Sequence, residues 1–151
     1  MKKVLIALDY GISARKIAEQ GYNLAKSMKA KVTLLHVVAD ETYYSSIDAG
    51  PFMGFYGYDF FNIDDKNTLI ESSLHFLEKI KSHLKDPDIE IMAEKGDFSS
   101  VILDVATRNH SSIIVLGAHS KNWLVRTVMG SVTESVLSDS KIPMFIIPVK
   151  E

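Results

Sequence analysis

The sequence contains no cysteine among its 151 residues. Disulfide bonds, zinc–thiolate sites and catalysis by a thiol are therefore excluded, and the composition suits a reducing cytosol. A chain of this length is typical of one domain and buries roughly 68–70% of the surface that its unfolded chain exposes. We therefore expect an ordinary hydrophobic core without covalent cross-links.

The sequence also lacks an excess of charge of either sign and a membrane-length apolar run at its start. Its 17 Lys and Arg residues nearly balance 19 Asp and Glu residues, and no dense basic block is present. Broad nucleic-acid binding requires clustered cations and is therefore not expected. The apolar run at residues 4–8 ends at Asp9, which is too short for a signal peptide or a membrane span. We expect a cytoplasmic protein with no nucleic-acid or membrane partner.

Motifs typical of enzymes and metal sites are missing as well. The five histidines show no metal-ligand spacing, and the Walker A motif, the GxGxxG fingerprint and the SGGxD loop are absent. His119 is the best-placed titratable group, but no serine, cysteine or second carboxylate accompanies it in the pattern. We expect His119 at the surface, no site for a metal alone, and a protein that is not an enzyme.

Segments typical of strands alternate along the chain with segments of helical periodicity. Continuous apolar runs such as 4–8 and 113–116 are typical of strands buried on both faces of a parallel sheet. The order of elements predicts a single Rossmann-like α/β domain, with a five-stranded parallel sheet and helices on both faces. We expect the strand order 3-2-1-4-5, in which the order reverses between the first and fourth strands. We expect strands near 4–8, 32–38, 89–93, 113–116 and 144–149, and helices from the cap Ser13, over about 64–84, after Gly96-Asp97 and over about 131–138.

The most informative segment is 116–134, LGAHSKNWLVRTVMGSVTE, in which a buried-looking strand runs into Gly117. Thirteen residues later, Gly130-Ser131 opens a helix. Backbone amides at such turns and the positive end of a helix dipole bind phosphate groups. Ligands of parallel sheets bind beyond the carboxyl ends of the strands, where the strand order reverses. The pattern therefore predicts a nucleotide site between Asp9 and Gly117.

The start of the last helix also has a purely structural interpretation. Ser131-Val-Thr-Glu134 matches a capping box, in which the Ser131 side chain accepts from the Glu134 amide and Glu134 reaches back. A phosphate would accept hydrogen bonds from those backbone amides of Gly130, Ser131, Val132 and Thr133 that the capping side chains do not occupy. Otherwise it would have to displace the capping side chains. Lys121 and Arg126 are the nearby cations, and a solvated loop charge is their commoner role.

With these motifs the chain resembles the universal stress protein family over essentially its whole length. The ATP-binding branch of that family carries Gly, two residues, Gly, nine residues, and then Gly followed by Ser or Thr. The spacing holds here, but Ser120 replaces the middle glycine. A serine there would cost about 1 kcal/mol or more if a positive φ is needed, or would crowd the phosphates, whereas its hydroxyl could donate to a phosphate oxygen. The resemblance is carried by Ala7-Leu-Asp9, Leu35-His-Val37, Gly96, Gly117-Ala-His-Ser120 and Gly130-Ser-Val-Thr-Glu134.

The resemblance implies an ATP site, with or without Mg²⁺, and a homodimer formed through the C-terminal strand Met144–Val149. In this site Asp9 would accept from the ribose or the adenine amine, or ligate Mg²⁺. Taken alone, Asp9 could simply close a turn before Ser13, and the apolar residues of the set are ordinary core. The implied site residues are Ala7, Asp9, Val37, Leu116, Gly117, Ser120, Gly130, Ser131, Val132 and Thr133.

The segment from Asp40 to Asn62 differs from the rest of the chain. It holds eight of the fourteen aromatic residues, and its charged residues are all acidic, so contact with phosphates is not expected. A long irregular loop in a compact domain is usually functional or disordered. We expect a lid near the base or a contact with another protein, with local packing as the remaining alternative.

These observations favour a stress-response module that binds an adenine nucleotide and acts through occupancy and dimerisation. The first alternative is a dimeric interaction module without nucleotide, which Ser120 suggests. The second is a weak ATP hydrolase or phosphotransferase, whose turnover would depend on His119 or Asp9.

Overall fold

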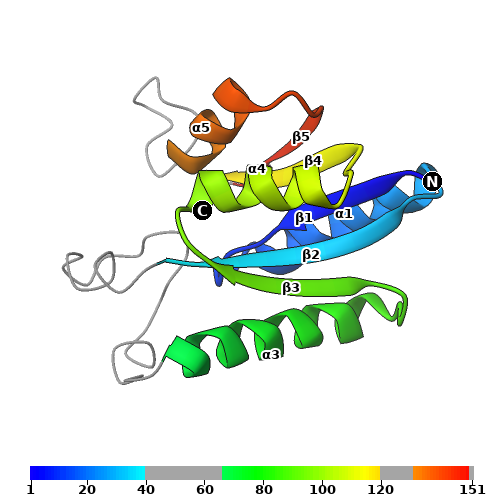
Figure 1. Cartoon of the computed structure of the whole chain (residues 1–151). Coiled ribbons are helices and arrows are strands. Elements are labelled where there is room, and N and C mark those ends of the chain that lie inside the picture. The colour runs from blue at the N-terminus through cyan, green and yellow to red at the C-terminus, as the bar shows by residue number, and fades with distance from the viewer. Residues whose placement is uncertain (40–65, 120–130, 150–151) are drawn as a thin grey trace.

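The structure is a computed structural model of the chain, and it describes residues 1–39, 66–119 and 131–149. The aromatic-rich segment 40–62 lies outside these residues, so its interpretation stays a prediction. Figure 1 shows the strands and helices alternating along the chain. The elements are β1 (Lys3–Ala7), α1 (Ala14–Ser27), β2 (Lys31–Val38), α3 (Lys66–Leu84), β3 (Glu90–Lys95), α4 (Phe98–Arg108), β4 (Ile113–His119), α5 (Ser131–Asp139) and β5 (Met144–Val149).

The five strands form one parallel sheet of order β3-β2-β1-β4-β5, which confirms the predicted fold. The strand order reverses between β1 and β4, where Val4 pairs with Ile113 and Ile6 with Val115. Because all strands are parallel, their carboxyl ends lie at one edge of the sheet. This edge is where ligands of such folds bind.

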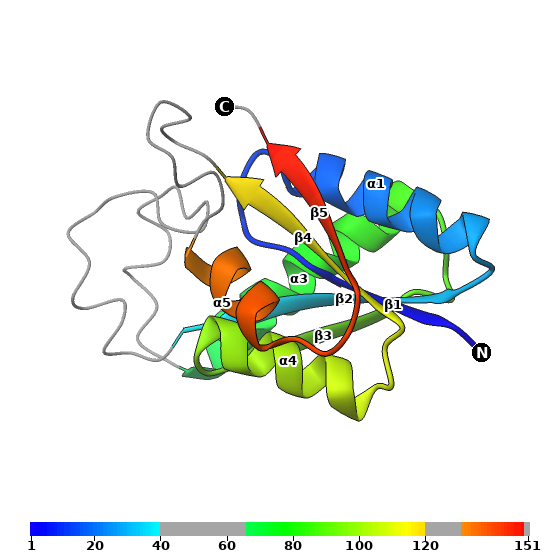
Figure 2. The same ribbon diagram turned by 90° about the horizontal axis from the view of Figure 1, so that it is seen from above.

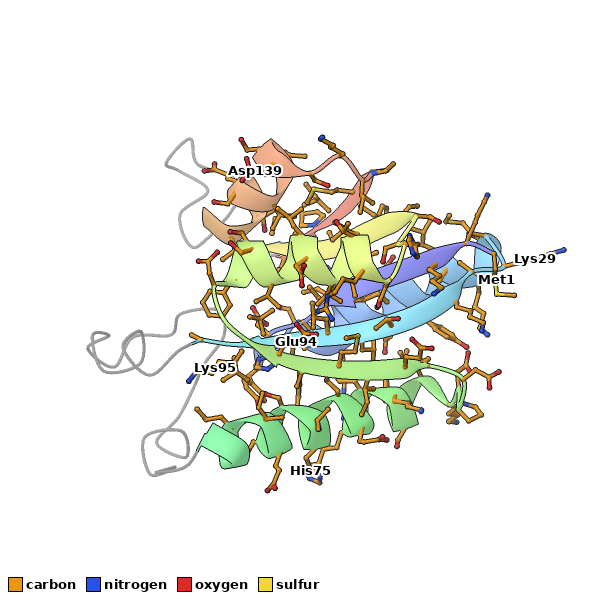
Figure 3. All side chains as sticks on the ribbon, in the orientation of Figure 1. Met1, Lys29, His75, Glu94, Lys95 and Asp139 are labelled. Atoms are coloured by element: carbon orange, nitrogen blue, oxygen red, sulfur yellow. The ribbon has the colours of Figure 1, made fainter. Side chains whose placement is uncertain are left out.

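Helices cover both faces of the sheet, as Figure 2 shows from above. One core cluster contains Ile17 of α1 and Leu77 of α3, and the other contains Phe98 of α4 and Val136 of α5. The central strands β1 and β2 are buried on both faces, which explains their continuous apolar sequences. Side chains fill the space between the sheet and each helical layer (Figure 3).

The helix starts agree with the sequence only in part. Asp97 caps α4 and accepts from the amide of Ser100 at 3.1 Å. Ser13 occupies the N-cap position of α1 as predicted, but its side chain makes no cap hydrogen bond. The reason is its backbone, with φ −87° and ψ −3°, whereas a capping side chain normally requires the extended region. The α5 helix begins at Ser131 as predicted, and the Ser131 side chain lies outside the described set.

The strand β5 forms one edge of the sheet and pairs only with β4 among the described strands. Its Phe145 is 37% exposed, and Leu137 on the neighbouring helix α5 is 45% exposed. Among the helices that the structure describes, none is long and apolar enough to cross a membrane.

Candidate functional site

The predicted site lies at the carboxyl edge of the sheet, where β1, β2 and β4 end and α5 begins (Figures 1 and 2). Beyond the last residue of β1, the amide of Leu8 donates to the carbonyl of Leu35 at 2.8 Å. This bond holds the chain against β2 until it reaches Asp9. The sequence-predicted residues of β1, β2 and β4 therefore end at the same edge.

The apolar residues of the predicted site belong to one cluster on the face covered by α4 and α5. Two of them, Val37 and Leu116, are buried within that cluster. The other two pack against it and remain partly exposed, which leaves apolar surface at the edge. The structure thus brings together Ala7, Val37, Leu116 and Val132.

Asp9 is buried, with 6% of its surface exposed, and lies two residues after the end of β1. Its Oδ1 accepts a hydrogen bond from the amide of Gly11 at 3.0 Å, which closes the turn that leads to α1. The structural interpretation of Asp9 as a turn residue is therefore correct. Any ligand role would add to this turn role, because a carboxylate accepts several hydrogen bonds.

The interpretation of Gly117 as a residue of a turn is wrong. The strand β4 continues through Gly117 to His119, and Gly117 pairs with Ile147 of β5. A Cβ atom at Gly117 would lie 2.2 Å from Cδ1 and 3.0 Å from Cγ1 of Ile17 on α1. Because Ile17 is buried, the packing of α1 on the sheet favours glycine at this position, whatever binds at the edge.

The side chain of Thr133 links the start of α5 to β4, two residues before that strand ends. Its Oγ1 donates to the carbonyl of Gly117 at 3.3 Å, and the residue is buried. The first backbone amides of an α-helix have no acceptor within the helix, so the amides of Ser131, Val132 and Thr133 form the positive end of α5 beside β4. Such a helix end suits a phosphate group.

The remaining predicted site residues are not covered by the structure. Ser120 and Gly130 lie outside the described residues, as do Lys121 and Arg126. The backbone of His119 is part of β4, and nothing is described of its side chain. Their roles stay predictions.

Sequence reasoning missed a polar cluster beside Asp9, formed by the half-buried Tyr10 and the buried His36 and Ser73. The Ser73 Oγ lies 2.7 Å from Nδ1 of His36 and 3.1 Å from the hydroxyl of Tyr10. Burial lowers the pKa of His36 to about 4, although the negative charge of Asp9 acts in the opposite direction. A signal existed, because His36 interrupts an apolar strand and Ser73 lies four residues before the core residue Leu77.

The described residues contain no group of three or more His, Cys, Asp or Glu side chains that could hold a metal ion.

Comparisons with known proteins agree with this architecture. Universal stress protein MJ0577 of Methanocaldococcus jannaschii is 29% identical over 156 residues, which cover 99% of this chain and 96% of that protein. Universal stress protein A of Escherichia coli strain K12 is 24% identical over 150 residues, which cover 99% of this chain and 96% of that protein.

Solved structures show the same fold. The structure of MJ0577 has a TM-score of 0.71 at 26% identity, over 99% of this chain and 97% of that chain. A universal stress protein solved in complex with cAMP has a TM-score of 0.67 at 16% identity, over 97% of this chain and 96% of that chain. The family model described as the universal stress protein family matches residues 1–148, and we conclude that this chain belongs to the universal stress protein family.

Proposed function

We propose that this protein binds an adenine nucleotide, ATP in the first instance, at the carboxyl edge between β1, β4 and α5. The observation that carries the proposal is the position of the α5 N-terminus, which the Thr133 hydroxyl links to the Gly117 carbonyl of β4. The strand order reverses between β4 and β1. A sheet edge at which the strand order reverses and a helix begins suits a phosphorylated ligand. The motif spacing in the sequence and the relative solved with cAMP support an adenine nucleotide.

Each part of the edge would have a distinct task. The apolar cluster that includes Ala7, Val37 and Leu116 would contact the base. The Asp9 carboxylate would accept from a ribose hydroxyl or the adenine amine, or ligate a phosphate-bound Mg²⁺. The phosphates would take the amides at the start of α5, with the contributions of Ser120 and Gly130 expected from the motif.

We propose that the nucleotide acts by occupancy in a cytoplasmic homodimer rather than by turnover. The sequence pairs the phosphate motif with no recognisable nucleophile and general base. The dimer would form through Met144–Val149, since an edge strand with exposed Phe145 favours pairing with a second copy.

One alternative function has direct support in the structure. Packing against Ile17 explains Gly117, and the bond to Gly117 employs the hydroxyl of Thr133, so two motif residues have roles that require no ligand. Together with Ser120 in place of the middle glycine, these roles favour an interaction module that has lost nucleotide binding.

Titration with ATP and Mg²⁺ separates the two functions. A ligand at 100 times its dissociation constant stabilises the folded state by about 2.7 kcal/mol, which raises the melting temperature of a domain of this size by roughly 5–10 °C. Asp9→Asn, which keeps the shape of the turn residue, should weaken binding. If millimolar ATP gives no heat of binding and no rise in melting temperature, the nucleotide function is rejected. If only the Ser120→Gly variant binds ATP, the alternative is favoured.

A further inference from the structure

A polar cluster at the site edge connects the turn after Asp9 to the opposite helical layer. Tyr10 follows Asp9 directly, His36 lies on β2, and Ser73 lies on α3. The Tyr10 hydroxyl lies 3.1 Å from Ser73 Oγ, although 63 residues separate the two in sequence. The cluster therefore bridges three elements that are distant in the chain.

The cluster is well packed as well as hydrogen-bonded. The Tyr10 ring centroid lies 4.3 Å from that of His36 and 4.7 Å from that of Phe76 on α3. Ser73 is fully buried, whereas His75, two residues later on α3, points away from the sheet (Figure 3). Tilted aromatic contacts of this kind hold a ring in one orientation. Tyr10 is thus fixed by both its ring and its hydroxyl.

A buried serine hydroxyl has one proton to donate and two positions that accept. Ser73 Oγ can therefore serve Tyr10 and the His36 Nδ1, which lies 2.7 Å away, at the same time. Loss of the contact with Tyr10 would remove one of the two hydrogen bonds that the fully buried Ser73 hydroxyl makes to these side chains. Motion of the turn at Asp9–Gly11 is consequently opposed by α3.

We propose that Tyr10 is a positioning residue, whose contact with Ser73 makes the Asp9–Gly11 turn and the first half of α3 one cooperative unit. Opening of either part would then break the same contact, so the two would open together. As a consequence that rests on the proposed function, a nucleotide held by Asp9 would stabilise α3, and α3 would influence nucleotide affinity by the same factor.

The free protein tests this coupling by hydrogen exchange of wild type and Tyr10→Phe. The variant keeps the ring contacts and loses the hydroxyl. We expect exchange at residues 69–77 to become about 3- to 10-fold faster relative to α4, the size that loss of one neutral hydrogen bond produces.

Tyr22→Phe is the matched control. Tyr22 lies on α1, and its hydroxyl donates to Oδ2 of Asp86, just beyond the C-terminal end of α3, at 2.9 Å. This variant therefore also removes one tyrosine hydroxyl, but from a contact at the other end of α3. We expect it to leave exchange at 69–77 unchanged relative to α4. Equal acceleration of 69–77 and α4 in Tyr10→Phe, or no acceleration in either, would overturn the proposal.

A second arm adds ATP and Mg²⁺. Slower exchange at 69–77 in wild type that is lost in Tyr10→Phe supports the coupling to the site. Binding that slows 69–77 equally in both proteins overturns the link through Tyr10. If wild type binds no ATP, the proposed function fails, and the comparison of the free proteins still decides whether Tyr10 couples the turn to α3.

Discussion

Gly117→Ala separates a packing requirement from a ligand requirement at the first glycine of the motif. The new Cβ would lie 2.2 Å from Cδ1 of Ile17, whereas carbon atoms pack at about 3.5–4.0 Å. Ile17 is buried, so it cannot turn into solvent. Overpacking of a core costs about 1–3 kcal/mol, and the reduced freedom of the unfolded chain offsets about 0.4–1 kcal/mol. We expect a net loss of roughly 1–2 kcal/mol.

The companion variant Ile17→Val removes the Cδ1 atom that makes the closest contact. Alone it should cost about 0.5–1.5 kcal/mol. If the clash explains the glycine, the double variant Gly117→Ala/Ile17→Val loses about 1 kcal/mol less than the sum of the two single variants. Urea unfolding at a constant m-value measures all four proteins. Additivity within about 0.5 kcal/mol, or an unchanged midpoint for Gly117→Ala, would refute the packing argument.

The same double variant tests whether the ligand also approaches Gly117. With its packing relieved, it should remain folded, so that any effect on ATP affinity is not caused by unfolding. Unchanged affinity indicates a glycine kept for α1 alone. A loss of tenfold or more indicates that the nucleotide approaches the β4 backbone as well.

Two further predictions concern side chains at the carboxyl edge. Thr133→Val removes the hydroxyl that donates to Gly117 and should cost roughly 1–2 kcal/mol in thermal unfolding, whereas Thr133→Ser keeps the donor and should retain most of the stability. Burial lowers the pKa of His36 from 6.5 to about 4, so the unfolded chain binds more protons between these values and stability should fall as the pH drops from 6.5 to 4. In urea unfolding across this range, His36→Gln should show a flatter pH profile, and an identical slope would contradict the assignment.

Local patterns were sufficient to predict most of the fold. The continuous apolar runs at 4–8 and 113–116 identified β1 and β4, because a strand buried on both faces has no polar alternation. The alternation of strands and helices, together with the family resemblance, predicted the strand order that the structure confirms. The sequence also indicated the edge at which Asp9 and the start of α5 lie.

Predictions from local sequence failed at two residues, Gly117 and Ser13. Gly117 resembled the end of a strand because glycine favours turns, but β4 continues to His119. Ser13 has the residue type of a helix cap, but its backbone is already helical and its side chain makes no cap hydrogen bond. Residue type gives a preference in both positions, and the neighbouring elements decide the outcome.

The sequence alone determined the element types, the spacing of the glycine motif and the expectation of a nucleotide site. These depend on periodicity and spacing within short segments. The contact of Gly117 with Ile17 and that of Tyr10 with Ser73 were decided by the tertiary structure. They join residues far apart in the chain, and the packing of one helix against one strand, which no single segment encodes, determines which side chains meet.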